Sequence, residues 1–532
     1  MQIANPAQEA GAEPAVRQKI QSLDPATGEV LAEFAPASGA EVQLAVAKAV
    51  QAMCDWRRMS VAERASYLFR LKGVLYGRRD EIARLITLEA GKPLVESMFT
   101  EVMVVLDALE YFGRKAAKFL APQPVPHHNL AMKLKRGRLV FEPYGVIGII
   151  SPANYPFSIP FNEIIPALIA GNTVVLKPSE FTPQVGLAIR DLFEAAKLPT
   201  GVAQVILGDG FTGRALTAAP IHKLIFTGSV ATGKRVQAAA AERLLPTVLE
   251  LGGKDAMIVC GDANLEMASS GAVWGAFTNA GQTCVSVERV YVVRSVAERF
   301  IALCVAKTKQ LRVGRGDDPS TDVGPLIRQR QVDIVSQQVS EAVAQGADPL
   351  CGARCPTLPG LNGFFYGPTV LTRVNHQMRL MREETFGPVL PIMVVEDEAE
   401  AVALANDSDY GLSASVWTRD RKRGERLARQ IQAGAVMVND CISYFGISEA
   451  PHGGPKMSGI GRTHSRLGLM EMVQVKYIDT DFGPSMPKPW WYGYGTKAHR
   501  FAQGFLAFLF GRGPAQRAGG VATMLANFGK KL

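Results

Sequence analysis

Hydrophobic and polar residues alternate along this chain with two different periods, and the helical period comes first. From residue 40 to residue 118, apolar positions recur every three or four residues, which predicts amphipathic helices with an end at Gly91 and Pro93. The stretch "MKLKRGRLVFEP" is typical of a hairpin with Gly137 at its turn. Short apolar runs then alternate with helical stretches, which indicates parallel β-α-β units around a buried sheet.

The short apolar runs fall into two series, so two α/β lobes are expected. The first series comprises "YGVIGII", "NTVVLK", "AQVIL" and "HKLIFTG", and its lobe ends near Gly252. The second follows Gly253 and comprises "DAMIVC", "ERVYVV", "LPIMVV", "SASVW" and "AVMVN". A late polar strand, "VQVKYIDTD", is a candidate to pair outside its own lobe. The predicted fold is α/β, with two parallel-sheet lobes and a small β element.

The composition is that of a soluble globular protein, because 47% of the 532 residues are hydrophobic and 20% are charged. The seven cysteines are scattered and odd in number, which fits a reducing compartment. Cys351 and Cys355 form the only close pair, without a His or Cys pair at zinc spacing. We therefore expect loop residues there and no metal site. The N-terminal "MQIANPAQEAGAEPAVRQKI" has no apolar signal core, so export is not expected.

The net charge of +9 is concentrated at the end of the chain. From Phe482 onward there are seven Lys or Arg residues and no acidic residue, so the body is not expected to bind nucleic acid. The same tail has aromatic residues at 490–492 and an apolar run, Gly504–Gly511, which is far shorter than the roughly 20 residues that span a bilayer. Three alternatives stay open: the tail lies in a membrane interface, packs on a neighbouring subunit, or is disordered.

The stretch "NAGQTC", from Asn279 to Cys284, follows a run of small residues. Its cysteine is compatible with packing, metal binding, redox chemistry or catalysis, and only the thiolate form is a strong nucleophile. Glu250, in "LELGGKD", ends an apolar strand and is followed by glycines, so it suits a proton acceptor that faces a cavity. The alternative for Glu250 is a solvated strand end.

Further polar residues follow predicted strands. Asn154, in "ISPANYPF", has two amide donors, which suit an oxyanion. Lys177 and Glu180, in "VVLKPSE", end the next strand, at the sheet edge where ligands of open α/β sheets bind. The alternatives are a proline-rich turn for Asn154 and a solvated loop for the other two.

Two glycine stretches are candidates for a phosphate site. "GDGFTG", Gly208–Gly213, matches a weak dinucleotide-binding pattern after a strand. "FTGSVATGK", Phe226–Lys234, follows a strand and opens a helix whose N–H groups could face a pyrophosphate. The second stretch is the better candidate because it lies between a strand and a helix. The residue patterns of the two motifs do not by themselves decide between them.

Together these stretches resemble the NAD(P)-dependent aldehyde dehydrogenase superfamily. The resemblance covers nearly the whole chain apart from the tail, and its elements occur in family order: "SPANYPF", "KPSE", "FTGS", "ELGGK", "GQTC", "EETFGP", "NDSDYGLSASV" and "PHGGPKMSGIG". It implies that Cys284 attacks the aldehyde and that Asn154 holds the oxyanion of the thiohemiacetal. Loss of hydride then leaves a thioester, for whose hydrolysis Glu250 activates a water.

The resemblance also implies a cofactor site and a division into domains. The implied cofactor residues are Lys177, Ser179 and Glu180 at the adenosine ribose, Gly228, Ser229 and Gly233 in the dinucleotide loop, and Glu384 and Phe386 at the nicotinamide ribose. A carboxylate at Glu180 repels a 2′-phosphate, so NAD is expected and NADP stays open. The implied domains are 18–128 with 144–252 for NAD binding (Rossmann-like), 253–440 for the catalytic thiol, 129–143 with 466–481 for oligomerisation, and 482–532 for the tail.

The substrate channel is expected to be apolar and aromatic. Its predicted residues are Tyr155, Phe157, Ile159, Tyr444 and Phe445. This set predicts oxidation of a medium- or long-chain aliphatic aldehyde, or an aromatic one, to the carboxylic acid. Acyl transfer to coenzyme A and a semialdehyde substrate are the alternatives.

Several positions depart from the family pattern. Ala153 stands where many members have Trp, and Thr463 stands where many have a Glu that is associated with proton exit. Glu163 is the only charge in "PFSIPFNEIIPAL", where semialdehyde-specific members often have Arg. His452, in "PHGG", replaces a frequent Phe and is expected to be structural.

The late strand and the hairpin resemble the family's intersubunit elements, which implies a homodimer or homotetramer. We expect a cytoplasmic enzyme with a small-molecule substrate. Whether it also binds peripherally to the inner face of a membrane depends on the tail.

Overall fold

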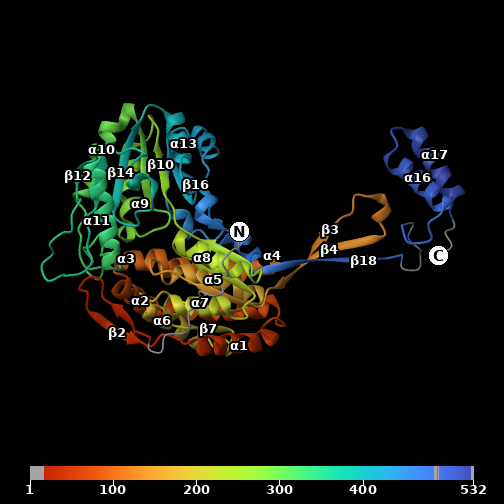
Figure 1. The fold of residues 1–532 in the computed structure, drawn as a ribbon, viewed down its shortest axis with the longest axis horizontal. Coiled ribbons are helices and arrows are strands. Elements are labelled where there is room, and N and C mark those ends of the chain that lie inside the picture. The colour runs from red at the N-terminus through yellow and green to blue at the C-terminus, as the bar shows by residue number, and fades with distance from the viewer. Residues whose placement is uncertain (1–16, 484–487, 489, 529–532) are drawn as a thin grey trace, which may run out of the picture. The chain divides into compact units, whose positions relative to one another are not determined.

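The computed structural model describes residues 17–483, 488 and 490–528 (Figure 1). The chain divides into two compact units. One consists of Met1–Phe119 with Pro143–Gln474, and the other of Leu120–Glu142 with Val475–Leu532.

The helical period of the N-terminal part forms long helices, as predicted. They are α1 (Gly39–Trp56), α2 (Val61–Ala90) and α4 (Met103–Phe119), with α3 (Leu94–Glu96) and a π-helical turn (Ser97–Val102) before α4. Ser38 and Ser60 each begin a helix with a capping box, which satisfies the first free N–H groups. α2 ends at Gly91, whose φ of 76° is the left-handed conformation that favours glycine.

The first series of strands forms a six-stranded sheet in the order β17-β9-β8-β5-β6-β7. The strands are β5 (Val146–Ile150), β6 (Thr173–Lys177), β7 (Ala203–Val205), β8 (Lys223–Thr227), β9 (Thr247–Glu250) and β17 (Gly459–Ile460). The pairs from β9 to β7 are parallel, and β17 is antiparallel to β9. The connecting helices are α5 (Ser158–Ala170), α6 (Pro183–Ala195), α7 (Gly210–Ala218) and α8 (Val230–Ala241). β5 and β6 are buried throughout, which explains why β5 has no polar side chain and why β6 is apolar between Thr173 and Lys177.

The second series forms a seven-stranded sheet in the order β12-β13-β14-β11-β10-β15-β16. The strands are β10 (Asp255–Val259), β11 (Val287–Val293), β12 (Asp348–Cys351), β13 (Thr369–Thr372), β14 (Val389–Val395), β15 (Ser413–Trp417) and β16 (Ala435–Val438). The pairs from β13 to β16 are parallel, and β12 adds an antiparallel edge. Cys351 was therefore wrongly expected in a loop, because it is the last residue of this edge strand.

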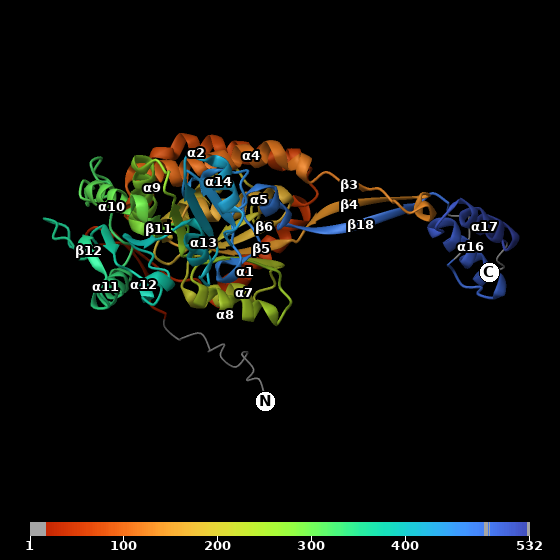
Figure 2. The ribbon, with the colours of Figure 1, turned by 90° about the horizontal axis from the view of Figure 1, so that it is seen from above.

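Helices cover both faces of the second sheet (Figure 2). They are α9 (Leu265–Phe277), α10 (Arg294–Thr308), α11 (Gln329–Ala344), α12 (Arg379–Arg382), α13 (Glu398–Asn406) and α14 (Arg421–Ala428). The first unit also contains α15 (Ser465–Met470) and an antiparallel pair of β1 (Ile20–Leu23) and β2 (Val30–Phe34). The predicted α/β fold with two parallel-sheet lobes is confirmed.

The second unit contains a three-stranded sheet in the order β18-β4-β3. Its strands are β3 (Gln123–Val125), β4 (Lys135–Pro143) and β18 (Val473–Asp481). The prediction that Gly137 forms a turn is wrong, because Gly137 lies inside β4 and pairs with Val125. A Cβ at Gly137 would come within 2.5 Å of the Tyr477 hydroxyl oxygen, so the glycine leaves space for this ring instead of reversing the chain.

The tail of the second unit folds into two packed helices, α16 (Thr496–Phe510) and α17 (Pro514–Ala526). Gly504 and Gly520 are buried where the helices cross, and a Cβ at Gly504 would lie 2.7 Å from the Gly520 carbonyl oxygen. The alternative that the tail is disordered is therefore wrong for the residues of α16 and α17. Lys530 and Lys531 lie outside the described residues. In the described part of the chain, no helix combines the length and apolarity needed to cross a membrane.

Candidate active site

The predicted site residues of the first sheet lie along one edge of it. In the order β9-β8-β5-β6, Glu250 ends β9, Gly228 follows β8, Asn154 follows β5 and Lys177 ends β6. Because these strands are parallel, their carboxyl ends meet at the same edge, which is where ligands of such sheets bind.

Cys284 lies in a loop between α9 and β11 whose backbone is left-handed at successive residues. The φ angles are 52° at Asn279, 54° at Ala280 and 74° at Gly281. A Cβ at Gly281 would lie 2.2 Å from the Gly387 carbonyl oxygen, so glycine is required there. The left-handed non-glycine residues each cost on the order of 1–3 kcal/mol, which the contacts around the loop must offset.

Asn154 is hydrogen-bonded to this thiol loop. Its carboxamide donates to the Gln282 carbonyl at 3.0 Å, and the Asn279 carboxamide donates to the Asn154 carbonyl at 2.9 Å. The hydroxyls of Tyr155 and Thr283 are 2.9 Å apart. These contacts hold Asn154 beside the backbone that leads to Cys284.

Two glutamates that the sequence analysis missed position the loop and helix α5. Glu96, in α3, accepts hydrogen bonds from the Thr278 hydroxyl and the Asn279 N–H, both at 2.9 Å. Glu101, in the π-helical turn, accepts the Ser158 N–H at the start of α5 at 2.7 Å. Both glutamates lie in the region 40–118, whose helical period predicted only helices that pack on the core. No signal in the sequence therefore indicated that they hold the thiol loop and α5.

The glycines after Glu250 allow other site groups to approach closely. A Cβ at Gly252 would lie 2.6 Å from the Glu384 carboxylate, and one at Gly253 would lie 2.2 Å from the Cys284 carbonyl oxygen. Glu250 is itself buried, and neither of its carboxyl oxygens has a hydrogen-bond partner among the described residues. The end of β9 thus adjoins both the thiol loop and "EETFGP".

Burial favours the neutral forms of the thiol and the acid. It raises the pKa of Glu250 well above its usual range, and the Glu163 carboxyl raises that pKa further. Burial likewise raises the pKa of the Cys284 thiol, with smaller increases from Asp255 and Glu384. A reaction that needs the thiolate must therefore move a proton away from this buried site.

The end of β6 presents a cation and a carboxylate. The buried Lys177 ammonium donates to the Gly208 carbonyl at 2.7 Å and lies 3.4 Å from the Glu180 carboxylate. The Ser179 hydroxyl accepts the Phe181 N–H at 3.3 Å, which fixes the turn that bears Glu180. The partly exposed Glu180 can accept hydrogen bonds from vicinal hydroxyls, as an adenosine ribose requires.

The structure ranks the two glycine stretches. At the start of α7, Asp209 accepts the N–H groups of Phe211 and Thr212 at 2.9 and 3.3 Å, and Arg17 pairs with the same carboxylate at 2.5 Å. The first N–H groups of α7 are therefore already bound by a side chain. "GDGFTG" forms a structural helix cap.

Helix α8 begins directly at the sheet edge and has an exposed N-cap, Ser229, which accepts the Thr232 N–H at 3.3 Å. A Cβ at Gly228 would lie 2.7 Å from the Phe226 ring, and one at Gly233 would lie 2.5 Å from the Leu251 side chain. The glycines let the helix start tight against the ends of β8 and β9. This N-terminus can accept a pyrophosphate.

Glu384 and Phe386 lie in a segment that a buried ion pair fixes. Glu288 accepts the N–H groups of Thr385 and Phe386 at 2.8 and 3.1 Å, and it pairs with Lys254 at 2.5 Å. Burial raises the pKa of Glu384 to about 8. The sequence analysis assigned no role to Lys254 or Glu288, although Lys254 lies in "ELGGK" and Glu288 begins "ERVYVV".

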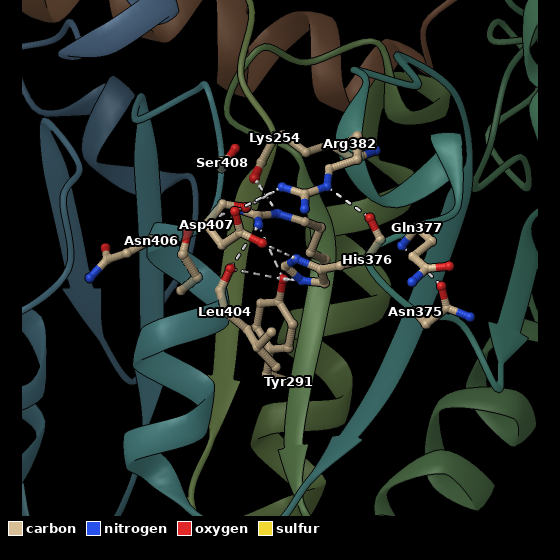
Figure 3. A network of polar contacts seen from close by, with 12 residues as sticks. Lys254, Tyr291, Asn375, His376, Gln377, Arg382, Leu404, Asn406, Asp407 and Ser408 are labelled. Atoms are coloured by element: carbon tan, nitrogen blue, oxygen red, sulfur yellow. Dashed lines mark hydrogen bonds and ion pairs between the residues drawn. The ribbon is translucent and has the colours of Figure 1, made fainter.

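A polar network anchors the chain that leads into "EETFGP" (Figure 3). His376 contacts the Tyr291 hydroxyl at 2.6 Å and the Asp407 carboxylate at 3.0 Å, and Arg382 pairs with Asp407 at 2.9 Å. Hydrogen bonds from Arg382 and His376 lower the pKa of Asp407 to about 2. The network joins two stretches, "EETFGP" and "NDSDYGLSASV", that are far apart in the sequence.

A cavity of about 200 Å³ opens onto Cys284. Its lining is Phe99, Thr100, Met103, Val104, Tyr155, Ile159, Trp274, Thr278, Thr283, Cys284, Val285, Ile442, Ser443, Phe445 and Gly446. No charged side chain is among these residues. Phe99, Met103 and Trp274 are also partly open to solvent, at 59%, 48% and 44% exposure, so the cavity reaches an apolar surface.

Three of the five predicted channel residues, Tyr155, Ile159 and Phe445, line this cavity, whereas two do not. Phe157, the residue before α5, is fully buried in the core, and the centre of its ring lies 4.7 Å from that of Phe161. The buried Tyr444 bonds through its hydroxyl to His452 at 3.0 Å.

The fold and this site place a thiol loop beside the sheet edge at which α/β proteins bind ligands, which is the arrangement of an α/β dehydrogenase. The described residues contain no group of three or more potential metal ligands. The chain belongs to the aldehyde dehydrogenase family, whose sequence profile matches residues 12–478. It is therefore an oxidoreductase that acts on aldehydes with NAD or NADP.

Relatives support this assignment over most of their length. The 4,4′-diapolycopene aldehyde oxidase of a Methylomonas species is 41% identical over 492 residues, which is 92% of this chain and 91% of that protein. A Mycolicibacterium smegmatis protein, provisionally named as an NADP⁺-dependent succinate-semialdehyde dehydrogenase, is 38% identical over 85% of this chain and 87% of its own. The NAD⁺ complex of a Bacillus cereus aldehyde dehydrogenase has 33% identity and a TM-score of 0.83, covering 87% of this chain and 93% of that one.

Proposed function

We propose that this enzyme oxidises an uncharged, medium- or long-chain apolar aldehyde to the carboxylic acid, with NAD as the preferred acceptor. The observation that supports this substrate class is the apolar lining of the cavity at Cys284. A hydrocarbon aldehyde, such as the one in the name of the Methylomonas relative, gains free energy by burying its chain there. A semialdehyde carboxylate, such as the one in the names of mycobacterial relatives, would lack a cationic partner among the lining residues.

In the proposed mechanism, the Cys284 thiolate attacks the aldehyde carbon after its proton passes to Glu250. The Asn154 side-chain amide and the Cys284 N–H stabilise the oxyanion of the thiohemiacetal. A nicotinamide cofactor bound at the sheet edge would supply the hydride acceptor, and loss of hydride from the thiohemiacetal would leave a thioester on Cys284. After the thiol proton has passed from Glu250 to solvent, the Glu250 carboxylate takes a proton from water, the resulting hydroxide attacks the thioester carbon, and the Cys284 thiolate leaves as the acid is released.

The proposed cofactor residues divide by position. Lys177, Ser179 and Glu180 would hold the adenosine ribose, and the α8 N-terminus, with Gly228, Ser229 and Gly233, would hold the pyrophosphate. Glu384 and Phe386 would contact the nicotinamide ribose. The partly exposed Glu180 is the residue expected to disfavour a 2′-phosphate. The first sheet would thus form the cofactor domain and the second the thiol domain.

The substrate proposal is tested by kcat/KM over aldehydes of increasing chain length, together with succinic semialdehyde, each with NAD and with NADP. Burial of one methylene group contributes about 0.8 kcal/mol, so we expect kcat/KM to rise by roughly threefold for each added methylene when most of this free energy is gained. A maximum with the anionic semialdehyde would contradict the proposal. Formation of acyl-CoA in the presence of coenzyme A would favour the acyl-transfer alternative, which the buried Glu250 disfavours because that reaction needs no activated water.

A homodimer or homotetramer is proposed from the resemblance of β4 and β18 to intersubunit elements. β18 exposes Val475 and Tyr477 at 61% and 47%, which a second subunit could cover. Sedimentation equilibrium of the full chain tests this proposal, and a monomer at micromolar concentration would contradict it.

We also propose that the tail binds the surface of an anionic membrane and that the enzyme is a peripheral cytoplasmic protein. Tyr492, Phe510 and Leu525 are exposed at 81%, 69% and 72%, and no acidic residue accompanies the basic residues of the tail. Flotation with anionic and with zwitterionic vesicles tests this, using Arg500→Glu with Arg517→Glu as the charge-reversed variant. Equal flotation of wild type and variant would contradict the preference for anionic lipid. No flotation of the wild type would contradict membrane binding and leave subunit packing as the explanation of the exposed face.

A further inference from the structure

Glu163, on α5, is a buried acid that the proposed mechanism leaves unused. It is 1% exposed, and one carboxyl oxygen accepts the Thr227 hydroxyl at 2.8 Å. The other oxygen has no hydrogen-bond partner, and no Lys, Arg or His among the described residues forms an ion pair with Glu163. A buried carboxyl group without these partners is uncommon in folded proteins and calls for a functional explanation.

The sheet register places Glu163 beside the proposed base. Thr227 and Glu250 are direct partners in the parallel pair of β8 and β9, so their side chains leave the same face of the sheet. Glu163 reaches Thr227 from the helix that covers this face. Glu250 is also buried, and both of its oxygens lack partners. Two carboxyl groups with unsatisfied oxygens therefore adjoin each other inside the protein.

Other ionisable groups around Glu250 do not neutralise it. The His452 imidazole lies 3.7 Å from Glu250, but burial lowers the pKa of His452 well below its usual range, so this ring is uncharged. Arg462 lowers the pKa of Glu250, and Glu471 raises it, both less than burial does. Glu163 is the largest charged influence on the pKa of Glu250.

We propose that Glu163 is a positioning residue that shares one negative charge with Glu250 and receives the proton that Glu250 removes from water. The proposal rests on Glu250 being the base of the proposed function. The transfer is balanced, because a proton leaves the Glu250 carboxylic acid and binds the Glu163 carboxylate, which restores the Glu250 carboxylate. Thr227, which is partly exposed at the end of β8, then lies between Glu163 and solvent.

This arrangement has a consequence for the pH dependence of the reaction. Two adjacent carboxyl groups titrate as a pair, and ionisation of one opposes ionisation of the other. Burial raises the pKa of Glu163 to about 8, whereas the Thr227 hydrogen bond lowers it by less. A neutral replacement at 163 allows Glu250 to ionise at lower pH, but it cannot accept a proton.

The test compares pH profiles of kcat for wild type, Glu163→Gln and Glu163→Asp. For Glu163→Gln we expect the rising limb to move to lower pH by about one unit, with a plateau that is lower than in wild type by about tenfold. Glu163→Asp keeps an ionisable group and should keep the limb near its wild-type position. An unchanged limb in Glu163→Gln, with a uniformly lower rate, would overturn the proposal and leave a structural role.

Two further variants make the outcome decisive. Thr227→Val removes the hydrogen bond that favours ionised Glu163, so the limb should move in the same direction by a smaller amount. If Glu163→Gln does not fold, an unchanged limb in Thr227→Val overturns the proposal. Glu250→Gln should abolish thioester hydrolysis; normal turnover of that variant would refute the base assignment itself, independently of the result at Glu163.

Discussion

Glu96 provides a test of how the thiol loop is held. In the wild type, the Thr278 hydroxyl and the Asn279 N–H each donate to the Glu96 carboxylate at 2.9 Å. Replacement of Glu96 by Ala removes this acceptor. Two hydrogen bonds to a charged acceptor contribute about 1.5–3 kcal/mol each, and burial of the carboxylate offsets part of this. We expect a loss of about 2–4 kcal/mol in the local stability of the loop. This loss acts on a backbone that already contains left-handed Asn279 and Ala280.

The expected result of Glu96→Ala is a fall in kcat of about 100-fold, because displacement of a nucleophile by about 1 Å has an effect of that size. The KM for NAD should change little, because the proposed cofactor residues lie on other segments. The matched control is Glu96→Gln, in which the amide oxygen can accept the Asn279 N–H and the amide nitrogen can donate to Thr278. Steady-state kinetics and the rate of Cys284 alkylation measure both effects. A wild-type rate in Glu96→Ala, or an equal loss in Glu96→Gln, would refute the reasoning.

Further predictions concern the thiol, its glycine and the buried acids. Cys284→Ala should abolish dehydrogenase activity while NAD binding, measured by fluorescence quenching, persists; retained turnover would exclude Cys284 as nucleophile. Gly281→Ala should be destabilised by more than about 1 kcal/mol in thermal unfolding, because the new Cβ would lie 2.2 Å from a carbonyl oxygen at a positive φ, and unaltered melting would contradict the contact. Glu163 has a folded pKa of about 8 against about 4.3 when unfolded, so its protonated form stabilises the fold at low pH and this contribution is lost as pH rises from about 4.3 to 8. Glu163→Gln should therefore reduce the fall in melting temperature between pH 6 and pH 8, and an unchanged fall would show that Glu163 is not buried in its neutral form.

Several elements could be predicted from local sequence because local physics decides them. The period of three and four residues over 40–118 depends on one buried helix face, and Gly91 ends α2 with a positive φ, as a glycine at that position favours. The apolar runs of β5 and of the centre of β6 require burial on both faces, which a parallel sheet covered by helices provides. The motif order, with Cys284 in "GQTC", was sufficient for the family.

Other features depended on contacts between distant segments. Glycine is typical of turns, but Gly137 lies inside β4, where the absence of a side chain leaves space for the Tyr477 ring of β18. Phe157 and Ile159 are equally apolar and two residues apart, yet only Ile159 lines the cavity, because the orientation of α5 against the sheet decides which side points inward. The two glycine motifs differ because Asp209 and Arg17 occupy the start of α7.

The sequence by itself determined the α/β class, the family and the identity of the candidate thiol, acid and amide, since these follow from periodicity and from motifs in a fixed order. Only the tertiary structure decided which groups adjoin them. Glu96 at the thiol loop, Glu288 behind "EETFGP" and Glu163 beside Glu250 are separated from their partners by 182, 97 and 64 or more residues along the chain. A carboxyl group's pKa depends on burial and on neighbours within a few ångströms, and only the packing of helices on the sheets brings those neighbours together.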